Sequence, residues 1–208
     1  MTGSKIKFFK IFYIINYYKK MCNRENPLYQ SYLKISNRWP LDDWSITKEC
    51  FDKIIEILPF GSTILEIGSG RSTGLLSKFY QMISLESNVD WINKFKSRYF
   101  HIPTKKMISE KFGETIWLDK EKIQTVLKDL NYDLLIVDSG GDRVGIYDNI
   151  NLFNTNVPII FDDTMNDDYL KCANLVAQKL NKTVETFQCK RNKYCVTWWD
   201  GKKFTLLT

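Results

Sequence analysis

The sequence predicts one α/β domain built on a mostly parallel sheet. Short apolar runs alternate with helical stretches from Thr63 onward, which is typical of βαβ units. A Gly-rich turn, Gly68-Ser69-Gly70, follows the first of these runs directly. The last two predicted strands are separated only by residues 190–193, so they should form an antiparallel hairpin rather than another crossover. We therefore expect a doubly wound sheet of seven strands that ends in an antiparallel hairpin.

The predicted elements follow from the spacing of apolar residues along the chain. The predicted strands are residues 63–67, 82–86, a weak one at 100–102 or 106–108, 132–138, 157–162, 183–189 and 194–199. The predicted helices are residues 72–79, 89–97, 120–130, 144–153 and 166–180. Another helix should precede the first strand, with Ser45 or Thr47 as its N-terminal cap.

Composition narrows the class of protein. With 208 residues and 44% hydrophobic residues, the chain can bury a core without disulfides or structural metal. Its 30 basic residues are interleaved with 24 acidic ones, so nucleic acid is not an expected partner. Five scattered cysteines predict a reducing compartment, which we expect to be cytoplasmic. No apolar run reaches the roughly 20 residues that a membrane-spanning helix needs.

Residues 1–44 are expected to form an amphipathic helix and a cover segment, ahead of a main domain over residues 45–208. Aromatic residues and lysines alternate at helical spacing from Lys5 to Met21, and a turn-rich link follows from Asn23 to Pro40. Two interpretations of this helix stay open. It could pack on the domain or on a second copy in a homo-oligomer, or it could lie on a membrane surface.

The Gly-rich turn is the strongest indication of a ligand. Gly68 and Gly70 would let the backbone turn sharply and approach a bound molecule closely. The next predicted strand ends in Glu86, at the separation where a carboxylate can accept hydrogen bonds from both hydroxyls of a ribose. Turns of this kind also bind dinucleotides or serve a structural role, so the motif alone leaves the ligand open.

Three further carboxylates follow the next two strands. Asp138 ends the run Tyr132 to Val137, and Asp162 and Asp163 end the neighbouring one. Ligands of parallel α/β sheets bind beyond the carboxyl ends of the strands, where these acids should converge with the Gly-rich turn. The three acids could hold Mg²⁺, or Asp138 or Asp162 could act as a general base, or they could cap helices.

Taken together, these motifs resemble class I S-adenosylmethionine-dependent methyltransferases over residues 39–199. The resemblance implies a Rossmann-like fold and S-adenosylmethionine as the cofactor. It implies cofactor contacts from the Gly-rich turn, from the strand before it and from the acids at the strand ends: Glu66, Gly68, Ser69, Gly70, Ser72, Glu86 and Asp138.

The resemblance also implies an activity. Many members carry a histidine after the fourth strand in a D-G-x-H pattern. This chain reads Asp138-Ser139-Gly140-Gly141-Asp142 instead, so that histidine is missing, and it stays open whether Asp142 replaces it. We expect O-methylation of a small hydroxylated acceptor, such as a sugar or a secondary metabolite. Variable loops at Lys105–Asp119 and Ser139–Tyr147 should select it. A nicotinamide-dependent oxidoreductase and a non-catalytic cofactor-binding scaffold are the alternatives.

Overall fold

The computed structural model describes residues 26–37, 45–139, 143–189 and 202–208. The chain divides into two compact units, Met1–Pro40 and Leu41–Thr208. The expected boundary after residue 44 and the amphipathic helix expected over residues 5–21 lie outside the described residues, so both stay predictions. In the described part of the chain, no helix is long and apolar enough to cross a membrane.

The first unit contains a helix, α2 (Pro27–Asn37), where we expected a turn-rich link. The Asn26 side chain accepts a hydrogen bond from the Leu28 N–H at 2.9 Å, and Pro27 suits the first helical position because it has no N–H to satisfy. The rings of Tyr29 and Tyr32 lie 5.7 Å apart on successive turns. The prediction was wrong here because Asn and Pro start a helix as readily as they form a turn.

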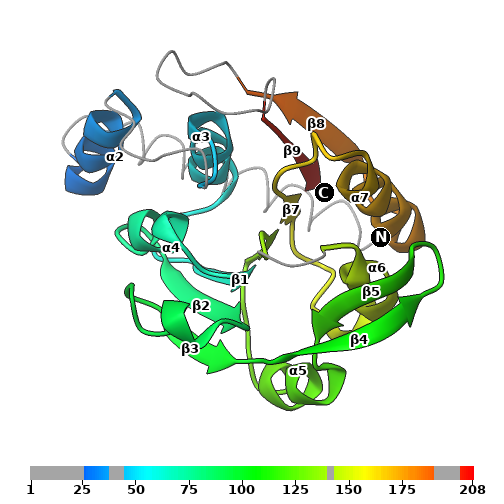
Figure 1. Cartoon of the computed structure of the whole chain (residues 1–208). Helices are drawn as coiled ribbons and strands as arrows, with labels where there is room; N and C mark the ends of the chain where they lie inside the picture. Colours follow the sequence, from blue (N-terminus) through cyan, green and yellow to red (C-terminus); the bar gives the residue numbers. More distant parts are fainter. Residues whose placement is uncertain (1–25, 38–44, 140–142, 190–201) are drawn as a thin grey trace, which may run out of the picture. The chain divides into compact units, whose positions relative to one another are not determined.

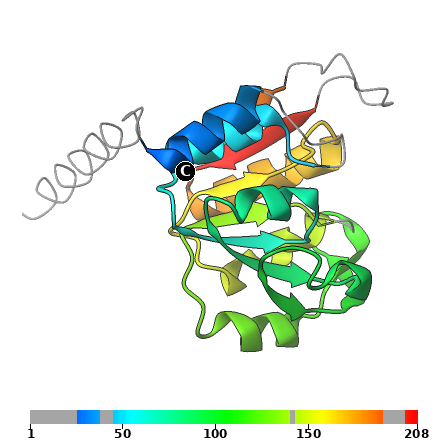
Figure 2. The same ribbon diagram turned by 90° about the vertical axis from the view of Figure 1, so that its left-hand side faces the viewer.

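The second unit is built on a seven-stranded sheet in the order β3-β2-β1-β6-β7-β9-β8 (Figure 1). Its strands are β1 (Thr63–Ile67), β2 (Gln81–Glu86), β3 (Arg98–His101), β6 (Leu134–Val137), β7 (Ile159–Phe161), β8 (Val184–Gln188) and β9 (Lys203–Leu207). Pairs from β3 to β7 are parallel, whereas β9 runs antiparallel to both β7 and β8. In Figure 2, β9 points in the opposite direction to β1. The predicted fold class, a Rossmann-like sheet with a C-terminal antiparallel hairpin, is confirmed.

The last strand lies further along the chain than predicted. We expected residues 194–199, which lie outside the described residues, but the strand that pairs with β8 is Lys203–Leu207. Its central residues Phe204, Thr205 and Leu206 are buried because β9 lies between β7 and β8. Burial between two strands, which the sequence alone does not show, identifies residues 203–207 as the partner of β8.

Helices cover both faces of this sheet. They are α3 (Lys48–Ile57), α4 (Arg71–Leu76), α5 (Lys120–Leu127), α6 (Ile146–Asn149) and α7 (Asp167–Leu180), with short 3₁₀ turns η1 (Val89–Trp91), η2 (Arg143–Gly145) and η3 (Ile150–Leu152). Figure 1 shows α3 and α4 on one face and α5, α6 and α7 on the other. Thr47 caps α3 as predicted, since its side chain accepts a hydrogen bond from the Cys50 N–H.

Two segments differ from the predicted elements. The helix expected over residues 89–97 is only the short turn η1, because Asn93 adopts a left-handed φ of 62° that ends helical geometry. The expected loop Lys105–Asp119 is an antiparallel hairpin of β4 (Thr104–Ser109) and β5 (Gly113–Leu118). This hairpin forms a separate two-stranded sheet that follows β3 directly in the chain.

Candidate functional site

The carboxyl ends of four neighbouring strands meet at one edge of the sheet. Ile67 of β1 pairs with Leu85 of β2 and with Val137 of β6, and Val137 pairs in turn with Phe161 of β7. The residues that follow these positions therefore leave the sheet together. The expected convergence of the Gly-rich turn with the acids at the strand ends is present, and Figure 1 looks onto this edge.

Gly68 is required by the protein itself rather than by a ligand. Its φ is +90°, a conformation that residues with a Cβ rarely adopt. An added Cβ would lie 2.5 Å from the backbone oxygen of Asp138 and 2.9 Å from the Cα of Ser139. Gly68 therefore allows the loop after β1 to pack directly against the loop after β6.

Gly70 faces open space. Its φ of −174° is ordinary extended backbone, and an added Cβ would meet no atom of the described residues within 4 Å. Its N–H donates to Thr73 Oγ1 at 2.9 Å, and the Thr73 hydroxyl donates to Glu66 Oε1 at 2.7 Å. The two glycines thus have different roles, because only Gly70 leaves room beside the turn that a ligand could fill.

Glu66 is a buried acid that holds the start of α4. It lies at the end of β1, and its Oε1 also accepts a hydrogen bond from the Ser84 hydroxyl. Burial raises the pKa of Glu66 to about 8, more than the hydrogen bonds from Ser84 and Thr73 lower it, and the nearby Glu86 carboxylate raises it further. Glu66 is therefore mostly protonated at neutral pH.

Glu86 is bonded to the Gly-rich turn. Its Oε2 accepts from the Ser69 N–H at 2.8 Å and the Ser69 hydroxyl at 2.9 Å, while its Oε1 accepts from the Asn88 N–H at 2.7 Å. A carboxylate offers about four lone pairs, so about one remains for a ligand. A ribose would contact Glu86 through one hydroxyl, unless the Ser69 hydroxyl turned away and freed a second lone pair.

The Ser72 hydroxyl has a structural bond. It accepts a hydrogen bond from the Ile46 N–H at 3.0 Å, and Ser72 is buried. This contact ties the segment before α3 to the start of α4. The hydroxyl is therefore already engaged within the protein, whereas the backbone beside Gly70 is open.

The three aspartates converge as expected. One carboxylate oxygen from each of Asp138, Asp162 and Asp163 lies within 4.8 Å of the others. Consecutive residues of a strand point to opposite faces, which argued against both Asp162 and Asp163 reaching one cleft. Asp163 has a left-handed φ of 55°, just after β7 ends. This conformation breaks the alternation of side chains between the two faces, so both carboxylates reach the same cluster.

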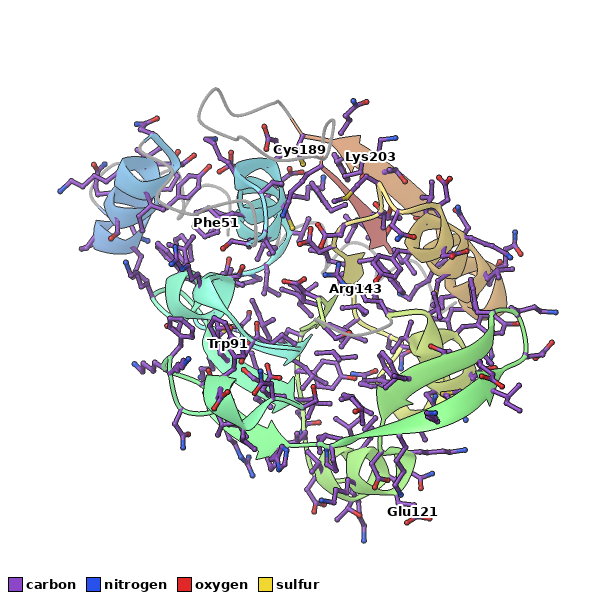
Figure 3. The ribbon with its side chains drawn as sticks, viewed as in Figure 1. Phe51, Trp91, Glu121, Arg143, Cys189 and Lys203 are labelled. Carbon is purple, nitrogen blue, oxygen red and sulfur yellow. The ribbon has the colours of Figure 1, made fainter. Side chains whose placement is uncertain are left out.

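A buried arginine that the sequence analysis did not single out binds this cluster. Arg143 Nη2 contacts Asp138 Oδ1 at 2.9 Å and Asp163 Oδ2 at 2.8 Å. Its Nη1 donates to the backbone oxygen of Asp162 at 2.8 Å, and its Nε donates to that of Ser139 at 3.0 Å. Figure 3 shows Arg143 beside β7. The only signal in the sequence was a basic residue immediately after an acidic, Gly-rich loop.

Arg143 does not fully compensate the buried acids. Burial raises the pKa of Asp138 to about 6, although the guanidinium opposes this shift. The pKa of Asp162 is raised well above its usual range by burial and by the charges of Asp138 and Asp163. Asp162 Oδ1 also has no hydrogen-bond partner among the described residues. At neutral pH Asp138 is mostly ionised, and its surroundings favour the protonated form of Asp162.

The donor set fits Mg²⁺ poorly. A cation coordinated by these carboxylates would compete with Arg143 Nη2, which already binds one oxygen each from Asp138 and Asp163. Lys202 Nζ lies 3.5 Å from the other oxygen of Asp163 and supplies a second positive charge. A metal would relieve the repulsion between neighbouring carboxylates, but Arg143 and Lys202 already do so.

Two other residues are candidates by their chemistry, the only histidine of the sequence and Asp142. His101 ends β3, and its Nε2 lies 3.2 Å from the backbone oxygen of Ser87, in line with a structural role. Asp142, which we considered as a replacement for the missing histidine, lies outside the described residues.

No family model and no curated protein sequence matches the chain. Precorrin-6y C5,15-methyltransferase from Geobacter metallireducens is similar in structure over 81% of this chain and 92% of its own, with a TM-score of 0.52 and 13% identity. Precorrin 8w decarboxylase from Methanobacterium thermoautotrophicum is similar over 80% of this chain and 98% of its own, with a TM-score of 0.51 and 12% identity. At these identities the likeness shows a shared fold and no more.

Proposed function

We propose that this chain is an S-adenosylmethionine-dependent methyltransferase that methylates a hydroxyl oxygen of a small acceptor, such as a sugar or a secondary metabolite. The observation that carries the proposal is the open space beside Gly70, at the edge where Asp138, Asp162 and Asp163 converge. The fold of the second unit supports the choice of cofactor. S-adenosylmethionine, when bound, supplies a methyl group on a positively charged sulfur.

The residues around the Gly-rich turn suit such a cofactor. Gly70 leaves space for its methionine part, and Glu86 offers its remaining lone pair to a ribose hydroxyl. Because the Ser69 N–H fixes the Glu86 carboxylate, the acceptor oxygen on Glu86 is held in place before binding. This arrangement contributes recognition rather than chemistry.

Asp138 is the residue best suited to act as the base. Its Oδ1 is held by Arg143, its side chain is 24% exposed, and it is ionised above pH 6. It would take the proton that an acceptor hydroxyl loses as its oxygen is methylated. Asp162, which the sequence offered as a second candidate, is buried, and burial raises its pKa well above its usual range, so it is less accessible to an acceptor hydroxyl than Asp138.

Replacing Gly70 by Val should remove cofactor binding and leave the fold intact. The new side chain fills space that no described part of the protein occupies, so it obstructs the ligand but not the packing around Gly70. We expect the affinity for S-adenosylmethionine to fall about 100-fold or more, as forcing atoms into a filled site costs up to roughly 3 kcal/mol. Isothermal titration calorimetry measures the affinity, and urea unfolding measures the stability.

Two outcomes of that titration contradict the proposal. One is a wild-type protein that gives no heat and no thermal stabilisation with S-adenosylmethionine at millimolar concentration. The other is binding of NAD⁺ in competition with S-adenosylhomocysteine, which would favour a nicotinamide enzyme.

Methyl transfer should increase with pH through an apparent pKa near 6 and should not depend on added metal. The ionised form of Asp138 accepts the proton, so activity is lost as pH falls below its pKa of about 6. Asp138→Asn should lower the rate by about 10²-fold or more, the usual contribution of a general base. The assay is release of S-adenosylhomocysteine across a pH series, with and without EDTA.

The same assay distinguishes the roles of the acids. Loss of activity with EDTA, restored by Mg²⁺, would assign the aspartates to a metal instead. Asp163→Asn is the matched variant, because Asp163 binds the same guanidinium nitrogen but is not assigned a proton transfer. A pH profile that keeps its inflection in Asp138→Asn would exclude Asp138 as the base.

A further inference from the structure

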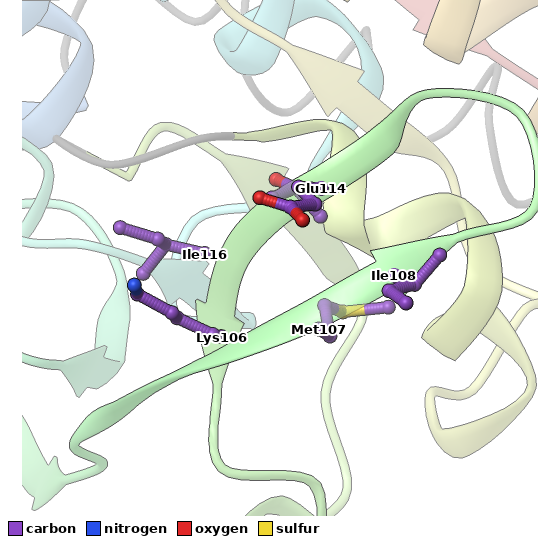
Figure 4. Close-up of a pocket in the computed structure, with 6 residues that line it drawn as sticks. Lys106, Met107, Ile108, Glu114 and Ile116 are labelled. Atoms are coloured by element: carbon purple, nitrogen blue, oxygen red, sulfur yellow. The ribbon is translucent and has the colours of Figure 1, made fainter.

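Two isoleucines on the outer face of the β4–β5 hairpin are exposed to solvent. Ile108 is 80% exposed and Ile116 is 48% exposed, and they belong to the few large apolar side chains that are exposed among the described residues. Together with Lys106 and Glu114 they line a groove of about 420 Å³. Figure 4 shows Lys106 and Ile116 extending to the same side of the hairpin.

The register of the hairpin fixes the pattern on this outer face, which we define as Lys106, Ile108, Glu114 and Ile116. Lys106 lies opposite Ile116, and Ile108 lies opposite Glu114. Opposed residues of an antiparallel pair share a face, as do residues two apart on one strand. The four side chains therefore form a two-by-two array, with the isoleucines on one diagonal and the opposite charges on the other.

The opposite face of the hairpin is already packed. Asn149 of α6 donates to the sulfur of Met107 at 3.7 Å, and a Cβ on Gly145 would lie 2.6 Å from the Trp117 side chain. The outer face has no such cover within the described residues. Lys105 on the packed side pairs with Asp119, whereas neither charge of the outer face forms an ion pair with another described residue.

From this array we infer that the outer face of the hairpin binds the same face of a second copy of the chain. A two-fold axis along the diagonal from Ile108 to Ile116 places each isoleucine against its own counterpart. The same rotation brings Lys106 onto the partner's Glu114, and it does so twice because the contact is symmetric. The strands of the two hairpins then cross steeply, as in orthogonal sheet packings.

The size of the face sets the expected affinity. A standard interface buries about 800 Å² on each partner, which is more than four side chains provide. The array would be the apolar centre of a modest interface, and we expect a dissociation constant of about 10 μM. This inference goes beyond methyl transfer and does not depend on it.

Charge reversal tests the pairing directly. Lys106→Glu alone places two acids opposite each other at both contacts, and Glu114→Lys alone places two bases there. Each variant should weaken the dimer about 100-fold or more, since like charges opposed across an interface cost several kcal/mol. An equimolar mixture of the two variants should form a heterodimer with wild-type affinity, because every contact then joins opposite charges again.

Sedimentation velocity of the full chain over a concentration series measures these states. The double variant with both reversals should dimerise like the wild type, and Lys120→Glu, the same charge change at an exposed position of α5, should have no effect. A wild-type chain that remains monomeric to millimolar concentration would overturn the inference. So would single variants that dimerise alone, or a mixture that does not. Circular dichroism confirms that each variant is folded.

Discussion

Replacing Arg143 by Met is expected to destabilise the protein by about 3 kcal/mol or more at neutral pH. The guanidinium binds Asp138 and Asp163 and donates to two backbone oxygens, so its removal leaves two carboxylates and two carbonyls without those partners. Methionine has a similar length and replaces only the packing. Urea unfolding measures the change, which is large because Arg143 is 7% exposed.

The sign of the pH dependence gives this prediction a second test. Burial and the loss of Arg143 both disfavour ionised carboxylates, so the destabilisation should be larger above the Asp138 pKa of about 6 than below it. At pH 5 Asp138 takes up a proton, and the cost of leaving it without Arg143 decreases. A destabilisation that is equal at pH 5 and pH 8 would show that Arg143 contributes only packing.

Two other variants separate the effect of the Arg143 charge from the effect of its hydrogen-bond geometry and from that of losing an arginine elsewhere. Arg143→Lys keeps a positive charge but cannot reach all four acceptors, so it should fall between the wild type and Arg143→Met. Arg98→Met changes an exposed arginine whose guanidinium lies over the Phe100 ring, and it should alter stability by less than about 1 kcal/mol. A wild-type stability in Arg143→Met would mean that the cluster is not neutralised by this residue.

The sheet was predictable because its central strands are short apolar runs buried on both faces. Residues 63–67 were predicted to the residue, and β2, β6, β7 and β8 lie within their predicted ranges or one residue beyond. The hairpin of β4 and β5 was not predicted, because its outer face carries Lys106, Glu114 and two isoleucines. A face with mixed polarity hides the alternation by which a strand is recognised.

The site was predictable only in part, for a related reason. Strand ends are visible in a sequence, so the acids at those ends could be expected to converge. Arg143 could not be assigned, because its partners come from both β6 and β7 and its geometry depends on the turn η2. Likewise, Gly68 and Gly70 look equivalent in the sequence. Only the folded structure shows that Gly68 packs against the backbone of the loop after β6.

Replacing Gly68 by Ala is expected to cost about 4 kcal/mol or more, enough to unfold a marginal domain. The added methyl group would lie 2.5 Å from the Asp138 backbone oxygen, and the φ of +90° is unfavourable for any residue with a Cβ. Neither loop can move away easily. The Gly68 N–H is bonded to the Leu85 oxygen at 2.8 Å, and the Asp138 N–H to the Ile67 oxygen at 3.1 Å.

Gly70→Ala is the matched control, because the same atom is added two residues away in the same turn. Its extended φ and open surroundings should limit the loss of stability to about 1 kcal/mol, the scale of a change at a helix N-cap. Urea unfolding of both variants, followed by titration with S-adenosylmethionine, separates the two roles. Gly68→Ala should lower the free energy of unfolding strongly. Gly70→Ala should largely keep its stability and lose affinity for S-adenosylmethionine. Equal stability of the two variants would show that the loop after β6 does not pack against Gly68, and the proposed position of Asp138 beside the cofactor would then be wrong.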